Sequence, residues 1–170
     1  MLIFYIAISL DGYIARKDGS VDWLGSDEAA DADYQQFYAT IDGLLMGKRT
    51  YDQVLGFGEW PYPGKPTYVL THHPPDHHPE GVIFVSGSPE DILALMDRER
   101  LTRIWLVGGT EAAVPFLQQA LIEDYTIFVM PILLGDGIPL FPAGLPEHRL
   151  DLVSAGIIGD GMVKLVYRRK

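Results

Sequence analysis

The 170-residue sequence contains no cysteine. Disulfide bonds, thiolate nucleophiles and thiolate metal sites are therefore excluded. The sequence also lacks any apolar run that approaches the roughly 20 residues needed to cross a bilayer. Met1 leads directly into strand-like sequence, without the basic region or cleavage site of a signal peptide. We therefore expect a cytoplasmic protein.

Basic residues are few relative to acidic ones. The 13 lysines and arginines face 23 aspartates and glutamates, which gives a net charge of -10 at pH 7. Such a chain would not attract nucleic acid or an anionic membrane over long range, so neither is an expected partner. An anionic ligand would need local donors that hold it against this field. The length and the hydrophobic share of 48% predict one globular domain over residues 1–170.

The most informative stretch covers residues 104–111. Its apolar start predicts a strand buried on both faces, which Gly108 and Gly109 then end. Residues 112–121 predict a helix with Pro115 near its start, where a missing N–H is tolerated. Free N–H groups at the positive end of such a helix suit a phosphate. The alternative is a tight turn that needs glycine for steric reasons and binds nothing.

A second strand, glycine and helix start occur at residues 43–51. Residues 43–46 predict a strand, and Gly47 then precedes Lys48 and Arg49 at the start of a helix. Two cations at a helix N-terminus oppose the helix dipole, so an anion between them would relieve the conflict. The alternative is a pair of solvated surface cations.

The remaining pattern alternates strands with helices and ends in a hairpin. It predicts an α/β fold with a mostly parallel mixed sheet and a C-terminal antiparallel edge, whose ligand lies at the carboxyl ends of the parallel strands. The further predicted strands are residues 2–8, 67–70, 82–85 and 125–131, with a hairpin of 150–155 and 162–168. Helices are expected from the N-cap Ser26 to about residue 40 and after the N-cap Ser88, with loops at 16–20 and 135–141.

Four of the five histidines lie between residues 72 and 78. Adjacent histidines separated by prolines do not present the spacing that metal sites use most readily, and no acid cluster accompanies them. A solvated loop without metal is therefore the preferred interpretation. Thr71 and His72 follow a predicted strand, where they could still contact a ligand at the edge of the sheet.

Two residues near the first predicted helix are candidates for a pocket. Asp33 precedes Phe37 by four positions and so shares its helix face. The alternative for Asp33 is a solvated position at the border of the apolar stripe. Trp23 either walls a pocket or pins the preceding loop.

Four segments together resemble the dihydrofolate reductase-like superfamily, and specifically the branch similar to the C-terminal reductase domain of bacterial riboflavin biosynthesis. They are residues 9–15, 46–51, 107–110 and 131–141. The resemblance implies a three-layer fold, a mixed sheet flanked by helices, that binds NADPH along the carboxyl edge of its strands. In the family the Gly-Gly peptide that matches Gly108 and Gly109 is typically cis.

The resemblance also implies the cofactor-binding residues. The family usually has an arginine near the adenosine 2′-phosphate, where this chain has His72 and His73, so the choice between NADPH and NADH stays open. The helix start at the cofactor phosphates is matched by Gly47, Lys48, Arg49 and Thr50, and the strand end at the 2′-phosphate is matched by Thr71 and His72. The glycine pair beside the nicotinamide and diphosphate is matched by Gly108, Gly109 and Thr110. Further cofactor contacts are expected at Ala7 and Val107.

On the substrate side, Asp33 matches the acid that binds the pterin in dihydrofolate reductases. In riboflavin-pathway reductases a tryptophan is followed by a serine or threonine and then by an arginine that helps to hold a ribose phosphate. Here Trp23 is followed by acids and no arginine, and no deaminase domain precedes the segment. We expect hydride transfer to a C=N or C=O group of a small pterin- or pyrimidine-like substrate. Asp33 is the catalytic candidate, and Trp23, Phe37 and Tyr51 are the candidate substrate-binding walls.

Two other functions stay open. One is a non-catalytic NADP(H)-binding module in which the cofactor regulates association with a partner, and the other is a structural homo-oligomer with a vestigial cleft. The hydrophobic tip at residues 138–141 and the terminal hairpin offer a dimer surface in all three cases, and the family is commonly dimeric. We therefore expect a homodimer.

Overall fold

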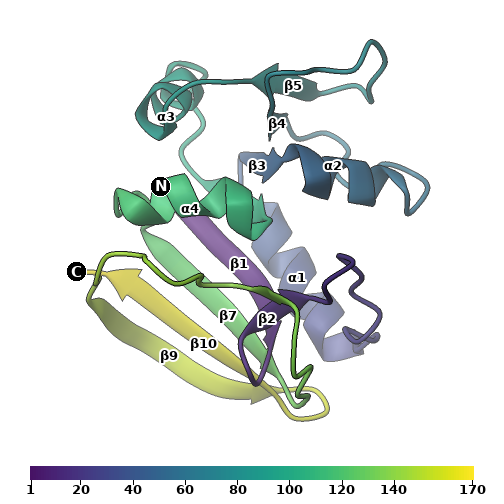
Figure 1. Cartoon of the computed structure of the whole chain (residues 1–170), viewed down its shortest axis with the longest axis vertical. Helices are drawn as coiled ribbons and strands as arrows, with labels where there is room; N and C mark the ends of the chain where they lie inside the picture. The colour runs from purple at the N-terminus through teal and green to yellow at the C-terminus, as the bar shows by residue number, and fades with distance from the viewer.

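The computed structural model describes all residues 1–170, and an eight-stranded sheet forms its centre (Figure 1). The strand order is β5-β4-β3-β6-β1-β7-β10-β9. Every pairing from β5 to β7 is parallel, and β10 pairs antiparallel with both β7 and β9. This confirms the mostly parallel sheet with a C-terminal antiparallel hairpin. The strands are β1 Leu2–Ser9, β3 Gly43–Gly47, β4 Thr67–Leu70, β5 Val82–Val85, β6 Ile104–Gly108, β7 Asp124–Met130, β9 Leu150–Ile158 and β10 Met162–Arg169.

Helices cover both faces of the sheet and give three layers. Alternate side chains of each strand enter opposite clusters: Phe4 packs with α3 (Pro89–Arg98) and α4 (Thr110–Gln118), whereas Ile3 packs with α1 (Glu28–Thr40) and α2 (Lys48–Leu55). In Figure 1, α4 lies in front of β1 and α1 behind the sheet. No helix is both long and apolar enough to cross a membrane.

Two helix boundaries differ from the sequence-based prediction. The N-cap of α1 is Asp27 rather than Ser26, because the Asp27 carboxylate accepts the N–H groups of Ala29 and Ala30. Helix α4 occupies Thr110–Gln118 rather than residues 112–121. It begins directly after the glycine pair, so Pro115 lies inside it rather than near its start. The predicted cap at Ser88 is confirmed, since Ser88 Oγ accepts the N–H of Asp91.

A second, two-stranded sheet was not predicted. Strands β2 (Tyr13–Ala15) and β8 (Ile138–Pro139) pair antiparallel, and β8 lies in a segment that was expected to be a loop. They are too short to have a recognisable periodicity. Asp11 holds the two segments together by accepting the N–H groups of Leu134 and Gly135 at 3.1 and 2.7 Å. The small sheet contributes Ile14 and Ile138 to the wall of the cavity described next.

Candidate cofactor and substrate site

Two helices begin side by side at the carboxyl edge of the sheet. Strands β3 and β6 are parallel neighbours, and each leads directly into a helix through a glycine. Gly47 caps α2 and Gly109 caps α4, and neither helix has a side-chain cap hydrogen bond. The first N–H groups of both helices therefore lack side-chain partners, and the positive ends of two dipoles lie at one edge.

Close packing restricts Gly47, because an added Cβ atom would lie 3.0 Å from Cβ of Ala112. A Cβ atom added to Gly109 would lie 3.5 Å from Oγ1 of Thr50, which is an ordinary contact. Gly108 has a φ of 131°, a conformation that other residues rarely adopt. The peptide between Gly108 and Gly109 is cis, as the resemblance implies. The two helix starts thus form one glycine-lined cradle.

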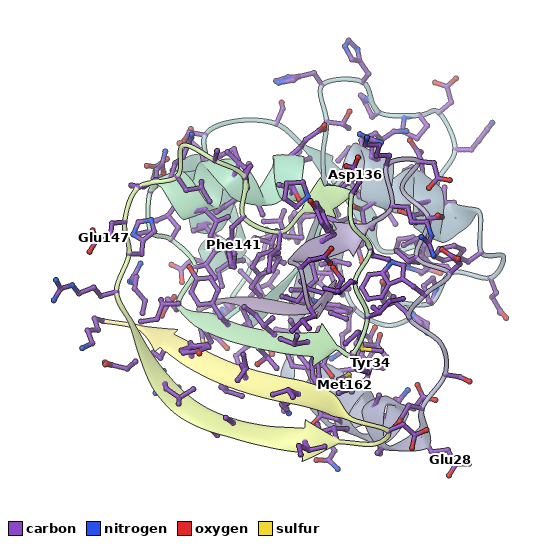
Figure 2. All side chains as sticks on the ribbon, turned by 60° about the horizontal axis from the view of Figure 1, so that its bottom comes forward. Glu28, Tyr34, Asp136, Phe141, Glu147 and Met162 are labelled. Atoms are coloured by element: carbon purple, nitrogen blue, oxygen red, sulfur yellow. The ribbon has the colours of Figure 1, made fainter.

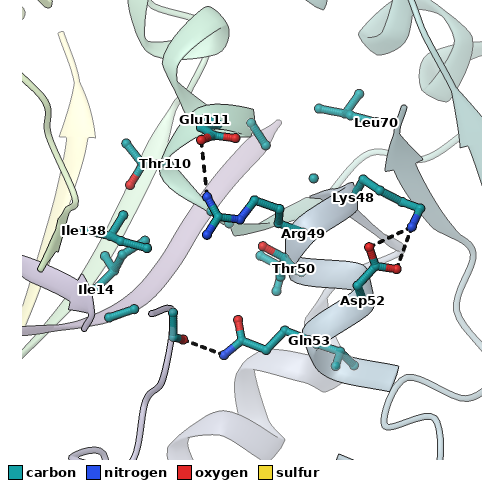
Figure 3. A pocket seen from close by; sticks show the side chains of 18 of the residues that line it. Ile14, Lys48, Arg49, Thr50, Asp52, Gln53, Leu70, Thr110, Glu111 and Ile138 are labelled. Atoms are coloured by element: carbon teal, nitrogen blue, oxygen red, sulfur yellow. Dashed lines mark hydrogen bonds and ion pairs between the residues drawn. The ribbon is translucent and has the colours of Figure 1, made fainter. Parts of the chain in front are cut away.

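A cavity of about 1070 Å³ lies against this cradle. Figure 3 shows this cavity, which Thr50 of α2 and Thr110 of α4 both line. Gln53 donates a 2.8 Å hydrogen bond to the carbonyl of Gly19, which fixes the loop at the opposite wall. The cavity brings together all eleven cofactor-binding residues expected from the sequence: Ala7, Gly47, Lys48, Arg49, Thr50, Thr71, His72, Val107, Gly108, Gly109 and Thr110.

Both cations of this cavity are paired with carboxylates at its surface. Lys48 Nζ lies 2.6 and 2.7 Å from the two carboxylate oxygens of Asp52, and Arg49 Nη1 lies 3.5 Å from Oε1 of Glu111 (Figure 3). Such exposed pairs contribute little to stability, so these side chains can turn to an anion at small cost. They are the only lysine and arginine that line this cavity.

A second cavity of about 520 Å³ adjoins the first. The two share Ile6, Ala7, Leu24 and Val107, so they meet across β1 and β6. Figure 2 shows Tyr34 of α1 close to Met162 at the start of β10, and both residues line this cavity. Its aromatic walls are Tyr5, Tyr34, Trp105 and Phe128.

Asp33 lies behind the wall of the second cavity. Its Oδ2 atom accepts a 2.9 Å hydrogen bond from the Tyr5 hydroxyl, and its Oδ1 atom lies 2.5 Å from Nζ of Lys164. Burial and the hydrogen bond to Asp33 raise the pKa of Tyr5 above its ordinary value. Burial also raises the pKa of Tyr34 to about 12. Both phenols therefore stay protonated at neutral pH, and the single O–H of Tyr5 is already donated to Asp33.

The three candidate substrate walls do not line either cavity. Tyr51 is fully buried, with its ring 5.8 Å from that of Trp60, because its position in α2 faces the sheet. Phe37 stacks on Tyr5 at 4.0 Å and so supports a wall from behind. Trp23 precedes Leu24, which lines both cavities, but Trp23 itself lines neither.

Sequence reasoning missed the residues that form the aromatic walls. Tyr5, Trp105 and Phe128 lie on three strands that are adjacent in the order β6-β1-β7. Strand alternation places each of them on the α1 side, and register pairs Ala7 with Phe128. The sequence thus contains this alternation, which assigns each aromatic residue to one face of the sheet. It does not show that the three residues form one wall until the order of the strands is known.

The fold and the paired helix starts define an α/β protein with a cleft at the carboxyl edge of its sheet. The particular family follows from comparison with known proteins. The model of the RibD C-terminal domain matches residues 1–164, so the chain belongs to this family. The family resemblance stated from the sequence motifs is thereby confirmed.

Individual proteins similar to this chain agree with that assignment. The chain is 37% identical over 169 residues to the uncharacterized protein YwjB of Bacillus subtilis (strain 168), which covers 98% of this chain and 97% of YwjB. It is similar to a putative riboflavin biosynthesis protein from Shewanella sp. PV-4, with a TM-score of 0.90, 34% identity and coverage of 99% and 98%. Dihydrofolate reductase from Enterococcus faecalis, in complex with NADP(H) and RAB-propyl, shares the fold, with a TM-score of 0.70, 18% identity and coverage of 100% and 96%.

Proposed function

We propose that the protein is an NADPH-dependent reductase that transfers hydride to a C=N or C=O group of a small pterin- or pyrimidine-like substrate. The observation that carries the proposal is the continuity of the two cavities, one lined by the paired helix starts and the other by aromatic side chains. Membership of the RibD C-terminal domain family supports a reductase of this kind. The fold shared with a dihydrofolate reductase bound to NADP(H) supports the cofactor.

The residues present fit a dinucleotide phosphate. Gly47 and Gly109 leave the backbone N–H groups of α2 and α4 accessible to a diphosphate, which needs such donors in a chain of net charge -10. Lys48 and Arg49 supply the nearby positive charge. NADPH, when bound, would supply the hydride, and the protein would orient the reactants and exclude water.

The second cavity fits the substrate. Tyr5, Tyr34, Trp105 and Phe128 provide flat apolar surfaces against which a heterocycle can stack. Asp33 would act on the substrate through Tyr5, since its carboxylate orients the Tyr5 hydroxyl. In this proposal Asp33 is a positioning residue.

The proposal is tested by following NADPH oxidation with a panel of pterins, pyrimidines and small carbonyl compounds. We expect turnover of at least one heterocycle and saturable NADPH binding. Absence of turnover together with absence of NADPH binding would refute the reductase.

A non-catalytic NADP(H)-binding module is the second candidate. It is favoured by the engagement of both Asp33 oxygens with Tyr5 and Lys164, which leaves neither oxygen of the catalytic candidate free for a substrate. This function predicts tight NADPH binding without oxidation by any member of the panel.

We also propose that the protein is a homodimer. In β9 and β10 one face carries Leu152, Ala155 and Ile157 beside Val163 and Leu165, and Leu152 and Ile157 are largely exposed. These side chains are uncharged, so a second copy can approach here despite the net charge of -10 on each chain. β9 is also an edge strand with an unpaired side.

A further inference from the structure

The second cavity carries charge of one sign only. Its charged lining residues are Asp27, Asp31 and Asp160, which come from the start of α1 and from the turn between β9 and β10. Asp31 and Asp160 are exposed, and Asp27 is half-buried. Asp27 Oδ2 accepts the N–H of Asp160 at 3.1 Å, which holds the turn against the helix. The three carboxylates therefore lie on one side of the cavity.

No cation balances this charge. No lysine, arginine or histidine lines the second cavity. The ammonium of Lys164 lies 5.6 Å from the ring centroid of Phe128, one of the walls, and is paired with Asp33. Arg16 and Lys17, in the loop before Leu24, are paired with Asp22 and Asp136.

Hydrogen bonds keep Asp27 ionised. It accepts the N–H groups of Ala29, Ala30 and Asp160, and the bonds from Ala30 and Asp160 lower the pKa of its carboxyl most. A phosphate in this cavity would therefore lie near carboxylates. It would lose part of its hydration, and no cation of the cavity lining would compensate for that loss. The aromatic walls, by contrast, favour a flat uncharged ring.

We propose that the second cavity selects a flat heterocycle without a phosphate group, uncharged or cationic, and discriminates against phosphorylated aminopyrimidines. The inference rests on the proposed function, because it identifies the second cavity as the substrate site. In this proposal phosphate groups bind only in the first cavity, where Lys48 and Arg49 lie near the phosphates of the cofactor. The second cavity binds a substrate that has no phosphate group.

The test compares two ligands that differ only in the phosphate: 5-amino-6-ribitylaminouracil and its 5′-phosphate. Their affinities for the full chain are measured by calorimetry without cofactor, so that turnover is not required. We expect the 5′-phosphate to bind about tenfold more weakly than the unphosphorylated compound. Repulsion between its phosphate group and carboxylates several ångströms away, at the solvated entrance of the cavity, can produce a difference of this size. The ratio should fall as salt is added, because salt screens exposed charges.

A matched pair of double variants identifies the source of the discrimination. Asp31→Asn/Asp160→Asn neutralises two lining acids, and Glu28→Gln/Asp76→Asn neutralises two exposed acids that do not line the cavity. Both change the net charge from -10 to -8. Asp31 and Glu28 lie in the same first turn of α1, so the effect on the helix is also matched. The affinity ratio should fall severalfold in the first double variant and stay unchanged in the second.

Three results would overturn the inference: equal or tighter binding of the phosphate, binding of neither ligand, or equal effects of the two double variants. Failure of the reductase proposal is separate. If no compound supports NADPH oxidation but the unphosphorylated ligand binds more tightly, the reductase fails and the selectivity stands. If a phosphorylated pyrimidine is the best oxidant of NADPH, the reductase stands and the selectivity fails.

Discussion

Asp33 combines an ion pair with a hydrogen bond in a partly buried position. Its side chain is 18% exposed and that of Lys164 is 27% exposed. One carboxylate oxygen faces the ammonium and the other accepts the Tyr5 hydroxyl. Asp33 thereby couples α1 to β10 and to the aromatic wall of the second cavity.

Replacing Asp33 should destabilise the fold. Asp33→Asn leaves the ammonium of Lys164 without its counter-ion above the ring of Phe128, so we expect a loss of about 1–3 kcal/mol in the free energy of unfolding. Urea denaturation measures the change. Glu28→Gln on the same helix is the control and should shift it by less than about 0.5 kcal/mol. Equal stability of Asp33→Asn and the control would show that the pair is not formed in solution.

Arg49 offers a test of charge in the first cavity. Its side chain is 69% exposed, so Arg49→Gln should leave stability unchanged but weaken NADPH binding about fivefold, through loss of one phosphate contact. The weakening should shrink at high salt. Arg149→Gln removes another highly exposed cation, which lines neither cavity, and should have no effect. Identical affinities in the two variants would argue against a phosphate contact at Arg49.

At the scale of elements, Asp42 joins two connections that precede neighbouring strands. Its Oδ2 atom accepts the Thr102 hydroxyl at 2.6 Å and the N–H groups of Thr102 and Arg103 at 2.9 Å each. The hydroxyl of Thr102 contributes most to a lowered pKa of the Asp42 carboxyl. This carboxylate fixes the entry to β3 against the entry to β6, the two strands that lead into the glycine-capped helices.

Asp42 should contribute to the loss of stability in acid. A carboxyl whose folded-state pKa lies below the unfolded value of about 3.9 stabilises the fold above that value. This stability is lost as the pH falls from about 5 through the folded-state pKa. Asp42→Asn should therefore show a smaller drop in urea midpoint between neutral pH and acid than the wild type. Asp76→Asn serves as control, and a drop as large in Asp42→Asn as in the control would contradict the prediction.

Local sequence signals were enough for most of the elements around the first cavity. The glycine pair after β6, Gly47 before α2 and the cap at Ser88 each depend on neighbours a few residues away. The start of α4 was predicted two residues too late, because the prediction followed the apolar run that begins at residue 112. The pairing of β2 with β8 was missed because it joins residues more than 120 positions apart, which no local pattern reports.

For the whole molecule, the sequence predicts the parallel direction of the strands better than it predicts the walls of the second cavity. Alternation of strands and helices gives a mostly parallel sheet, and the resemblance gives the cofactor edge. The aromatic walls need more, because Tyr5, Trp105 and Phe128 become neighbours only through the order β6-β1-β7. Tyr51 was expected in a wall, but the face of α2 that carries it packs on the sheet.

Association of two copies is a property of the whole molecule. Ile157 is 77% exposed on β9, so Ile157→Glu should leave the fold intact and place a charge in the proposed interface. Light scattering after size exclusion should give twice the chain mass of 18.9 kDa for the wild type and a monomer for the variant. The control Ile83→Glu alters an exposed isoleucine on β5, at the opposite edge of the sheet. A monomeric wild type, or dissociation of both variants alike, would contradict the proposed dimer.

The most direct test of the account is an NMR titration of the 15N-labelled protein with NADPH, read at the backbone amides. The account predicts saturable shifts concentrated in residues 48–50 and 110–112, at the starts of α2 and α4, with further shifts at Ala7 and Val107. The loop of residues 72–78 beyond His72 and the hairpin of β9 and β10 should shift little. Absence of saturable shifts, or shifts that leave both helix starts unaffected, would contradict the claim that the two glycine-capped helices hold the cofactor phosphates.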